Sequence, residues 1–345
     1  MFRGLKLVPK LDALQLRGVH AALLSAVVLG LAPIFGKQAL NAGTPVLTLV
    51  VLRTILATAL LWLGVALFRR PYLYIYPAGL LGCLIAGLIN GLGSLMYYSG
   101  LSHLDASLGH LLYTIYPLVL TLLARLDGYP ISSFTVFRLA LALVAIFLLT
   151  QNGAAFSEAS GALLMIGSGL FYAFHLAVNQ RVLYDMPPQT VTLYTLTAMS
   201  ATVGAAYLLA GRPGLPPTSA AWNGVLLLTG ATLISRLALF TGVKHLGSVQ
   251  TALLGLSELL VTIVASLLFL GEQRTPIQWL GAGLLAAAML LVMREKSLGV
   301  MPRPKPWYEI LTTPFPPVTP PVAPEAPQPG AASEASSSLR EPPPT

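Results

Sequence analysis

Runs of apolar residues long enough to cross a lipid bilayer recur along this chain from residue 18 to residue 293. A transmembrane helix needs about 20 consecutive, predominantly apolar residues. Charged residues make up only 9% of the chain and hydrophobic residues 55%, whereas about a quarter of an ordinary soluble protein is charged. These features predict an all-α integral membrane protein that crosses the bilayer many times.

The apolar pattern predicts ten transmembrane helices joined by short connections that are rich in turn residues. The expected spans are residues 18–40, 46–68, 77–100, 105–124, 134–150, 161–180, 190–210, 222–243, 248–270 and 276–293. A basic N-terminal segment, residues 1–17, precedes the first span, which lacks a small-residue cleavage site and is expected to stay in place.

Lysine and arginine are distributed unevenly between the two sets of loops. One set carries Arg3, Lys6, Lys10, Arg17, Arg69, Arg70, Arg125, Arg138, Arg181, Lys244, Arg294 and Lys296, and the other carries Arg212 and Arg274. The positive-inside rule then predicts a multi-pass protein of the plasma or inner cell membrane with both termini in the cytoplasm. Membrane orientation accounts for the net charge of +8, and we expect no binding of nucleic acid.

The composition changes after Met301 to proline, alanine, serine and glutamate. Such a segment cannot bury enough apolar surface to fold. We therefore predict a disordered, proline-rich cytoplasmic tail at residues 302–345. A docking ligand for a proline-recognising partner is the alternative interpretation of this tail.

The chain contains an internal repeat. The segment GLSHLDASLGHLLYTIYP begins at Gly100 and GVKHLGSVQTALLGLSEL begins at Gly242, a displacement of 142 residues that aligns His103 with His245. Five spans are an odd number, so a second copy enters the membrane with the opposite polarity. The sequence predicts two inverted five-helix repeats, residues 18–151 and 159–293, with a substrate site where the halves meet.

Four motifs together resemble one known family: LRTILA at residues 52–57, the fourth span with Pro117, the connection GLSHLDAS and the closing LGE at residues 270–272. The chain is similar to the EamA-type branch of the drug/metabolite transporter superfamily. The resemblance implies ten helices in two inverted repeats around a central cavity, and usually export of amino acids or other small metabolites. Arg53 matches the family's second-span arginine and Glu272 its closing glutamate. The chain departs from the family pattern at Leu29, Pro130 and Leu259.

Polar residues inside the spans identify the first candidate site residues. In the ninth span, Thr251, Glu258, Thr262 and Ser266 fall on one helical face, which we expect to line the cavity. In the eighth span, Arg236 lies at a similar depth, and we expect it to pair with Glu258. Ionisable residues within a membrane are costly and commonly functional, although a structural ion pair between the two helices would explain both residues as well.

The other candidates have two interpretations each. Tyr172, His175 and Asn179 form a polar line on the sixth span and either line the cavity or bond neighbouring helices. In the fourth span, His110 and Tyr113 are expected on a binding wall, although a structural role for a hydrogen-bonded His110 is the alternative. Tyr116 stands at the repeat position of Glu258. Arg53 either meets an anion or snorkels to the interface, and snorkelling is the interpretation we prefer for Lys37.

These features predict a secondary transporter that exports a small organic metabolite, such as an amino acid, by alternating access. Arg236 would meet a substrate carboxylate, Glu258 its amine or a coupling proton, and Tyr113, Tyr116 and Tyr172 would supply aromatic contacts. Expected partners are a small-molecule substrate, the lipid bilayer, a coupling proton and a second copy in a homodimer. The alternatives are efflux of hydrophobic cations and a non-transporting scaffold that acts through the tail. Without a catalytic or metal-ligand motif, we expect no enzyme activity, cofactor or metal.

Overall fold

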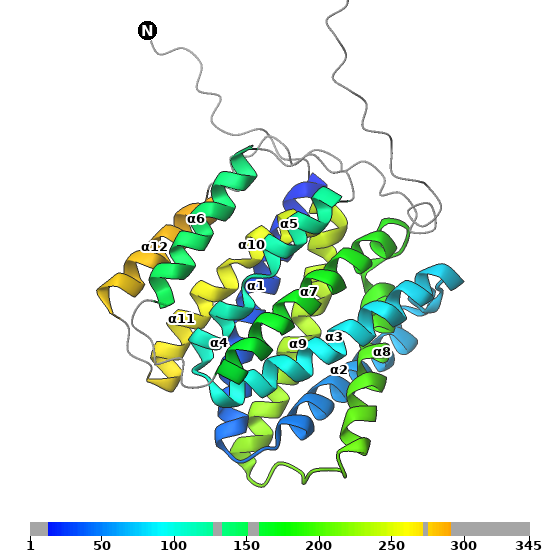
Figure 1. Cartoon of the computed structure of the whole chain (residues 1–345). Coiled ribbons are helices and arrows are strands. Elements are labelled where there is room, and N and C mark those ends of the chain that lie inside the picture. Colours follow the sequence, from blue (N-terminus) through cyan, green and yellow to red (C-terminus); the bar gives the residue numbers. More distant parts are fainter. Residues whose placement is uncertain (1–12, 127–132, 151–158, 272–274, 291–345) are drawn as a thin grey trace, which may run out of the picture. The chain divides into compact units, whose positions relative to one another are not determined.

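The computed structural model describes residues 13–126, 133–150, 159–271 and 275–290, and all the regular structure in these ranges is helical. In chain order the elements are α1 (Ala13–Asn41), α2 (Val46–Phe68), the 3₁₀ turn η1 (Arg70–Leu73), α3 (Pro77–His103), α4 (Ala106–Tyr113), α5 (Tyr116–Leu126), α6 (Ser133–Thr150), α7 (Ala159–Asp185), α8 (Pro188–Leu209), α9 (Ser219–Leu246), α10 (Ser248–Gly255), α11 (Ser257–Leu270) and α12 (Pro276–Leu290). Figure 1 shows their arrangement. The predicted tail, Pro130 and Glu272 lie outside the described residues.

Eight segments of the described residues are long and apolar enough to cross a membrane. They correspond to predicted spans one to four and six to nine, with α4 and α5 forming one segment and α10 and α11 another. The helices α6 and α12 lie at the predicted fifth and tenth spans and pack side by side (Figure 1). The described part of α12 has 15 residues, or about 22 Å of helix, so the count of ten spans stays a prediction.

Helices from the two halves of the chain pack against each other in reciprocal pairs. The helix α1 packs on α9, α3 on α7, and α2 on α8. A Cβ atom built on Gly18 would lie 2.8 Å from Cβ of His245, and one on Gly161 would lie 3.2 Å from Cβ of His103. These two histidines are the pair aligned by the sequence repeat. The same contact therefore occurs twice, once in each direction between the halves.

Both large pairs are antiparallel. Near Gly18 the start of α1 meets the end of α9, and near Gly161 the start of α7 meets the end of α3. Small residues allow this close packing: a Cβ on Gly93 of α3 would lie 2.9 Å from Cβ of Phe171 on α7. The ends of α3 and α7 consequently lie at opposite ends of the packed helices.

Two of the predicted continuous spans are broken near their middle. Pro117 has no N–H group and its ring clashes with the carbonyl four residues earlier, which explains why α4 ends at Tyr113 and α5 begins at Tyr116. The second break, at Leu256 between α10 and α11, occurs although Leu259 stands at the repeat position of Pro117. Here a Cβ on Gly255 would lie 2.5 Å from the hydroxyl oxygen of Tyr116, so packing between the halves accompanies the break.

Two lysines bond the ends of helices that belong to different antiparallel pairs. The Nζ atom of Lys37 on α1 donates to the carbonyl oxygens of Leu101 and Leu104, at 2.9 and 2.8 Å, where α3 ends. Lys244 on α9 donates to carbonyl oxygens where α7 ends, 2.8 Å from that of Met186. A cation stabilises the negative end of a helix. These bonds tie the α1–α9 pair to the α3–α7 pair at opposite ends.

Candidate functional site

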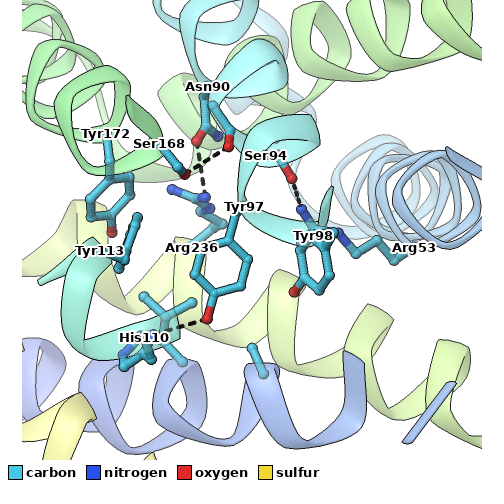
Figure 2. A pocket seen from close by; sticks show the side chains of 13 residues that line it. Arg53, Asn90, Ser94, Tyr97, Tyr98, His110, Tyr113, Ser168, Tyr172 and Arg236 are labelled. Atoms are coloured by element: carbon cyan, nitrogen blue, oxygen red, sulfur yellow. Dashed lines mark hydrogen bonds between the residues drawn. The ribbon is translucent and has the colours of Figure 1, made fainter. Parts of the chain in front are cut away.

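A cavity lies between the two antiparallel helix pairs, close to the repeat interface. Its volume is about 50 Å³, several times the space that a single water molecule needs. Six helices, α1, α2, α3, α4, α7 and α9, contribute to its wall. The described residues that line it are Leu29, Ala32, Arg53, Asn90, Gly93, Ser94, Tyr97, Tyr98, His110, Tyr113, Ser168, Tyr172 and Arg236 (Figure 2).

Arg53 brings the first positive charge into this wall. Its side chain is only 5% exposed, and Nη1 donates to Oγ1 of Thr232 at 3.0 Å while Nη2 donates to the hydroxyl of Ser94. The guanidinium carbon lies 4.6 Å from the ring centroid of Tyr98, a cation–π contact. Its Nε has no hydrogen-bond partner within the described part of the chain. Arg53 is thus a buried cavity residue, and the snorkelling interpretation does not apply.

Arg236 brings a second charge from α9. It is 8% exposed, Nη2 donates to Oδ1 of Asn90 at 3.2 Å, and Nη1 lies 3.3 Å from Nε2 of His175. The Tyr172 ring centroid is 5.4 Å from its guanidinium carbon. Figure 2 shows Arg236 among the side chains of Asn90, Tyr97 and Tyr172. Its hydrogen-bond partners are neutral, and the carboxyl of Glu258 interacts with its charge from outside the cavity wall.

Aromatic rings form a connected layer along one side of the cavity. Tyr113 lies 5.1 Å from Tyr97, 5.4 Å from Tyr116 and 5.3 Å from Tyr172 between ring centroids, and it stacks on His110 at 5.5 Å. Such contacts stabilise aromatic pairs beyond simple burial. The layer can contact the apolar part of a ligand and also separates the cavity from the polar group behind it.

That polar group is Glu258, at the start of α11. The carboxyl is 1% exposed and accepts a hydrogen bond of 2.8 Å from the Tyr116 hydroxyl. The two positions differ by 258 − 116 = 142, the displacement of the sequence repeat, so the two halves touch at equivalent residues. Glu258 does not line the cavity. It contacts the aromatic layer through Tyr116, whose ring lies 4.8 Å from that of Tyr172, and its carboxyl also interacts electrostatically with Arg236.

The expected direct ion pair of Arg236 and Glu258 is not found in the described structure, although the two groups interact electrostatically at longer range. Arg236 bonds residues of α3 and α7, whereas Glu258 bonds α5. The polar face of the ninth span was also expected in the cavity wall, but it packs elsewhere: Oγ1 of Thr262, for example, donates to the carbonyl oxygen of Gly30 on α1 at 2.7 Å. The sequence predicts how deep each residue lies along its helix. It does not predict which neighbouring helix each polar face contacts, because that depends on how the helices pack.

The remaining candidates divide into two groups. Arg53, His110, Tyr113, Tyr172 and Arg236 line the cavity, whereas Tyr116, His175 and Asn179 lie in the layer behind it. Asn179 supports His175: its Nδ2 lies 3.1 Å from Nδ1 of the imidazole, and its Oδ1 accepts a bond from Oγ1 of Thr195.

Leu29 and Ala32 also line the cavity, although apolar residues in an apolar helix carry no sequence signal that distinguishes them. Among the described residues, no three His, Cys, Asp or Glu side chains are grouped so that they could hold a metal ion.

Comparison with known proteins agrees with this architecture. Residues 16–151 and 159–294 each match the EamA-like transporter family. An uncharacterized transporter from Archaeoglobus fulgidus is 25% identical over 280 residues, which cover 81% of this chain and 97% of that protein. A protein of known crystal structure shares the fold with a TM-score of 0.61 at 18% identity, over 81% of this chain and 96% of the other. The resemblance noted in the sequence is confirmed, and the chain belongs to the EamA-like transporter family.

Proposed function

We propose that this transporter exports a small organic metabolite with a carboxylate group, by alternating access and in exchange for protons. The observation that carries the proposal is the buried cavity with two guanidinium groups and a wall of tyrosines. Guanidinium groups match carboxylates in charge and in bidentate geometry. Amino acids and other small organic acids meet this requirement, whereas a hydrophobic cation would face two like charges in the wall.

Alternating access requires the α1–α9 pair to separate from the α3–α7 pair, first at one end and then at the other. The bonds of Lys37 and Lys244 join these pairs at opposite ends. We propose that each lysine closes one entrance and that both bonds are present only when the cavity is shut. Glu258, at a contact between equivalent positions of the halves, is the proposed carrier of the coupling proton.

The proposed orientation gives a direct prediction. From the loop cations we expect Arg70 and Met293 on the cytoplasmic side and Gly211 on the outer side. A reporter enzyme that is active only in the cytoplasm is expected to give a signal when it is fused after Arg70 or after Met293. A reporter that is active only outside the cytoplasm is expected to give a signal when it is fused after Gly211. A cytoplasmic signal at Gly211 would contradict the ten-span topology and the inverted repeat.

Transport itself is tested with the purified full-length chain in proteoliposomes. Candidate organic acids, amino acids and hydrophobic cations are supplied with and without a pH gradient. We expect gradient-dependent flux of at least one carboxylate-bearing compound, with a loss of at least about tenfold in Arg236→Gln, equivalent to about 1.4 kcal/mol of lost interaction.

Arg70→Gln is the matched control, because Arg70 is exposed and bonds the carbonyl of Ala66 in the preceding turn. Deletion of residues 302–345 is expected to leave flux unchanged, whereas a scaffold acting through the tail would lose its function. Flux of hydrophobic cations alone would refute the proposed substrate class.

A further inference from the structure

The cavity contains two positive charges and no acidic side chain. Arg53 and Arg236 line it, and none of its described lining residues is Asp or Glu. In the described part of the chain the acidic residues are Asp105, Asp185 and Glu258. The first two lie at helix ends, and the third is outside the wall. The surface that a ligand would contact therefore carries no counter-charge to either guanidinium, although the carboxyl of Glu258 behind it interacts electrostatically with Arg236.

Neutral groups hold both guanidiniums in place but use only part of their donor capacity. A guanidinium has five N–H groups. The hydrogen-bond partners of Arg53 are Thr232 and Ser94, and those of Arg236 are Asn90 and His175. Burying a charge with neutral partners alone is costly unless a ligand of opposite charge completes the site.

Two buried nitrogens in the same wall have no hydrogen-bond partner within the described residues: Nε of Arg53 and Nε2 of His110. The Tyr97 hydroxyl lies 3.0 Å from Nδ1 of His110. When that hydroxyl donates, the neutral imidazole carries its hydrogen on Nε2 and offers it as a donor. Because unpartnered buried donors are rare and costly, these atoms mark places for ligand acceptors.

We infer that the preferred substrate is a small organic dianion, which carries two negative charges and no ammonium group. This inference rests on the proposed transport function and narrows its substrate class. Two charges neutralise both arginines, and the acceptor oxygens meet the free N–H groups. The ammonium group of an amino acid would instead face two cations in a wall without a described carboxylate, which selects against it. Dicarboxylates and phosphate esters share the required chemistry.

Calorimetric titration of the detergent-purified full-length chain compares four probes of similar size. Succinate and glycerol 3-phosphate are dianions, butyrate is a monoanion and alanine is a zwitterion. We expect at least one dianion to bind at least about tenfold more tightly than butyrate and alanine, the factor that one charge-assisted hydrogen bond confers. The dianion that binds identifies the second anionic group as carboxylate or phosphate. Equal or tighter binding of butyrate or alanine would overturn the inference. The inference would also be overturned if none of the four probes bound to protein that thermal unfolding shows to be folded.

Removing one positive charge tests the assignment to these arginines. In Arg53→Gln the affinity for the dianion is expected to fall to within about threefold of that for butyrate, a residual difference of less than 1 kcal/mol, while Arg53→Lys keeps part of the preference because it keeps the charge. Arg70→Gln should bind as the unchanged chain does, since Arg70 is exposed and lies in η1, beyond the end of α2. Thermal unfolding checks that each variant is folded. An unchanged preference in folded Arg53→Gln would refute the role of Arg53.

The inference about the dianion and the proposed transport function can be refuted separately. If a dianion binds but no compound crosses the membrane of proteoliposomes, the transport proposal fails and the site assignment stands. If a neutral amino acid is transported and no dianion binds preferentially, transport stands and the inference about the dianion is wrong.

Discussion

Replacing Glu258 by glutamine is expected to abolish transport driven by a pH gradient, while exchange of substrate across the membrane without a gradient continues. Glutamine has the size of glutamate and keeps the oxygen that accepts the Tyr116 hydrogen bond. It cannot take up or release a proton. Because Glu258 lies outside the cavity wall, the change removes the proposed coupling group without removing a ligand contact.

The measurement compares two kinds of flux in the same proteoliposomes: uptake driven by an imposed pH gradient and equilibrium exchange of labelled substrate. We expect driven uptake to fall by at least about tenfold and exchange to change little. Tyr116→Phe is the matched variant, since it removes the hydrogen bond but keeps the carboxyl. Driven uptake should persist in Tyr116→Phe at a reduced rate.

A purely structural role for Glu258 would give the opposite ranking. In that case Tyr116→Phe, which leaves a buried carboxyl without its described hydrogen-bond partner, would be the more harmful change. Equal loss of driven uptake and exchange in folded Glu258→Gln would likewise contradict a coupling role.

Removing either lysine is expected to open one entrance of the cavity. Charge-assisted hydrogen bonds contribute about 1.5–3 kcal/mol each, and a loss of about 2 kcal/mol at one end shifts a two-state equilibrium roughly thirtyfold. Lys37→Met should therefore favour opening at the end where α3 finishes, and Lys244→Met at the end where α7 finishes. In the proposed orientation these are the outer and the cytoplasmic ends.

A single cysteine in the cavity measures this shift. Cys83, which is buried in α3, is replaced by serine, and Ala32→Cys places a thiol in the cavity wall. A membrane-impermeant thiol reagent should label this cysteine faster from outside in Lys37→Met and faster from the cytoplasmic side in Lys244→Met. Arg70→Met, which removes an exposed cation bonded within its own chain segment, should change neither rate. Shifts in the same direction for both lysine variants would show that these bonds do not control separate entrances.

Much of the fold was predictable because membrane spans depend on local composition. Eight of the spans follow directly from apolar length, and the repeat was visible in the alignment of His103 with His245. The breaks within the fourth and ninth spans were harder to predict from the sequence. Pro117 explains one by its own chemistry, but Leu256 is an ordinary helix former, and its break coincides with packing of Gly255 against Tyr116 from the other half.

The site was predictable as a set of residue types more than as a set of contacts. Five of the selected residues do line the cavity. The prediction that Arg236 and Glu258 pair directly was wrong, because helical spacing and depth do not specify which neighbouring helix each helical face contacts. The correct partner of Glu258 was nevertheless encoded in the sequence, since Tyr116 stands exactly one repeat displacement before it. What the sequence lacked was the information that equivalent positions touch.

A contact between equivalent positions also limits the stoichiometry of the proposed proton coupling. If the two halves were identical, the residue at this place would meet its own copy: two carboxyls would face each other, or two phenols. In this chain the two halves differ in sequence, and one carboxyl meets one phenol: the Tyr116 hydroxyl oxygen lies 2.8 Å from Oε1 of Glu258. This contact holds a single carboxyl, so in the proposed proton-coupled mechanism it exchanges at most one proton in each transport cycle.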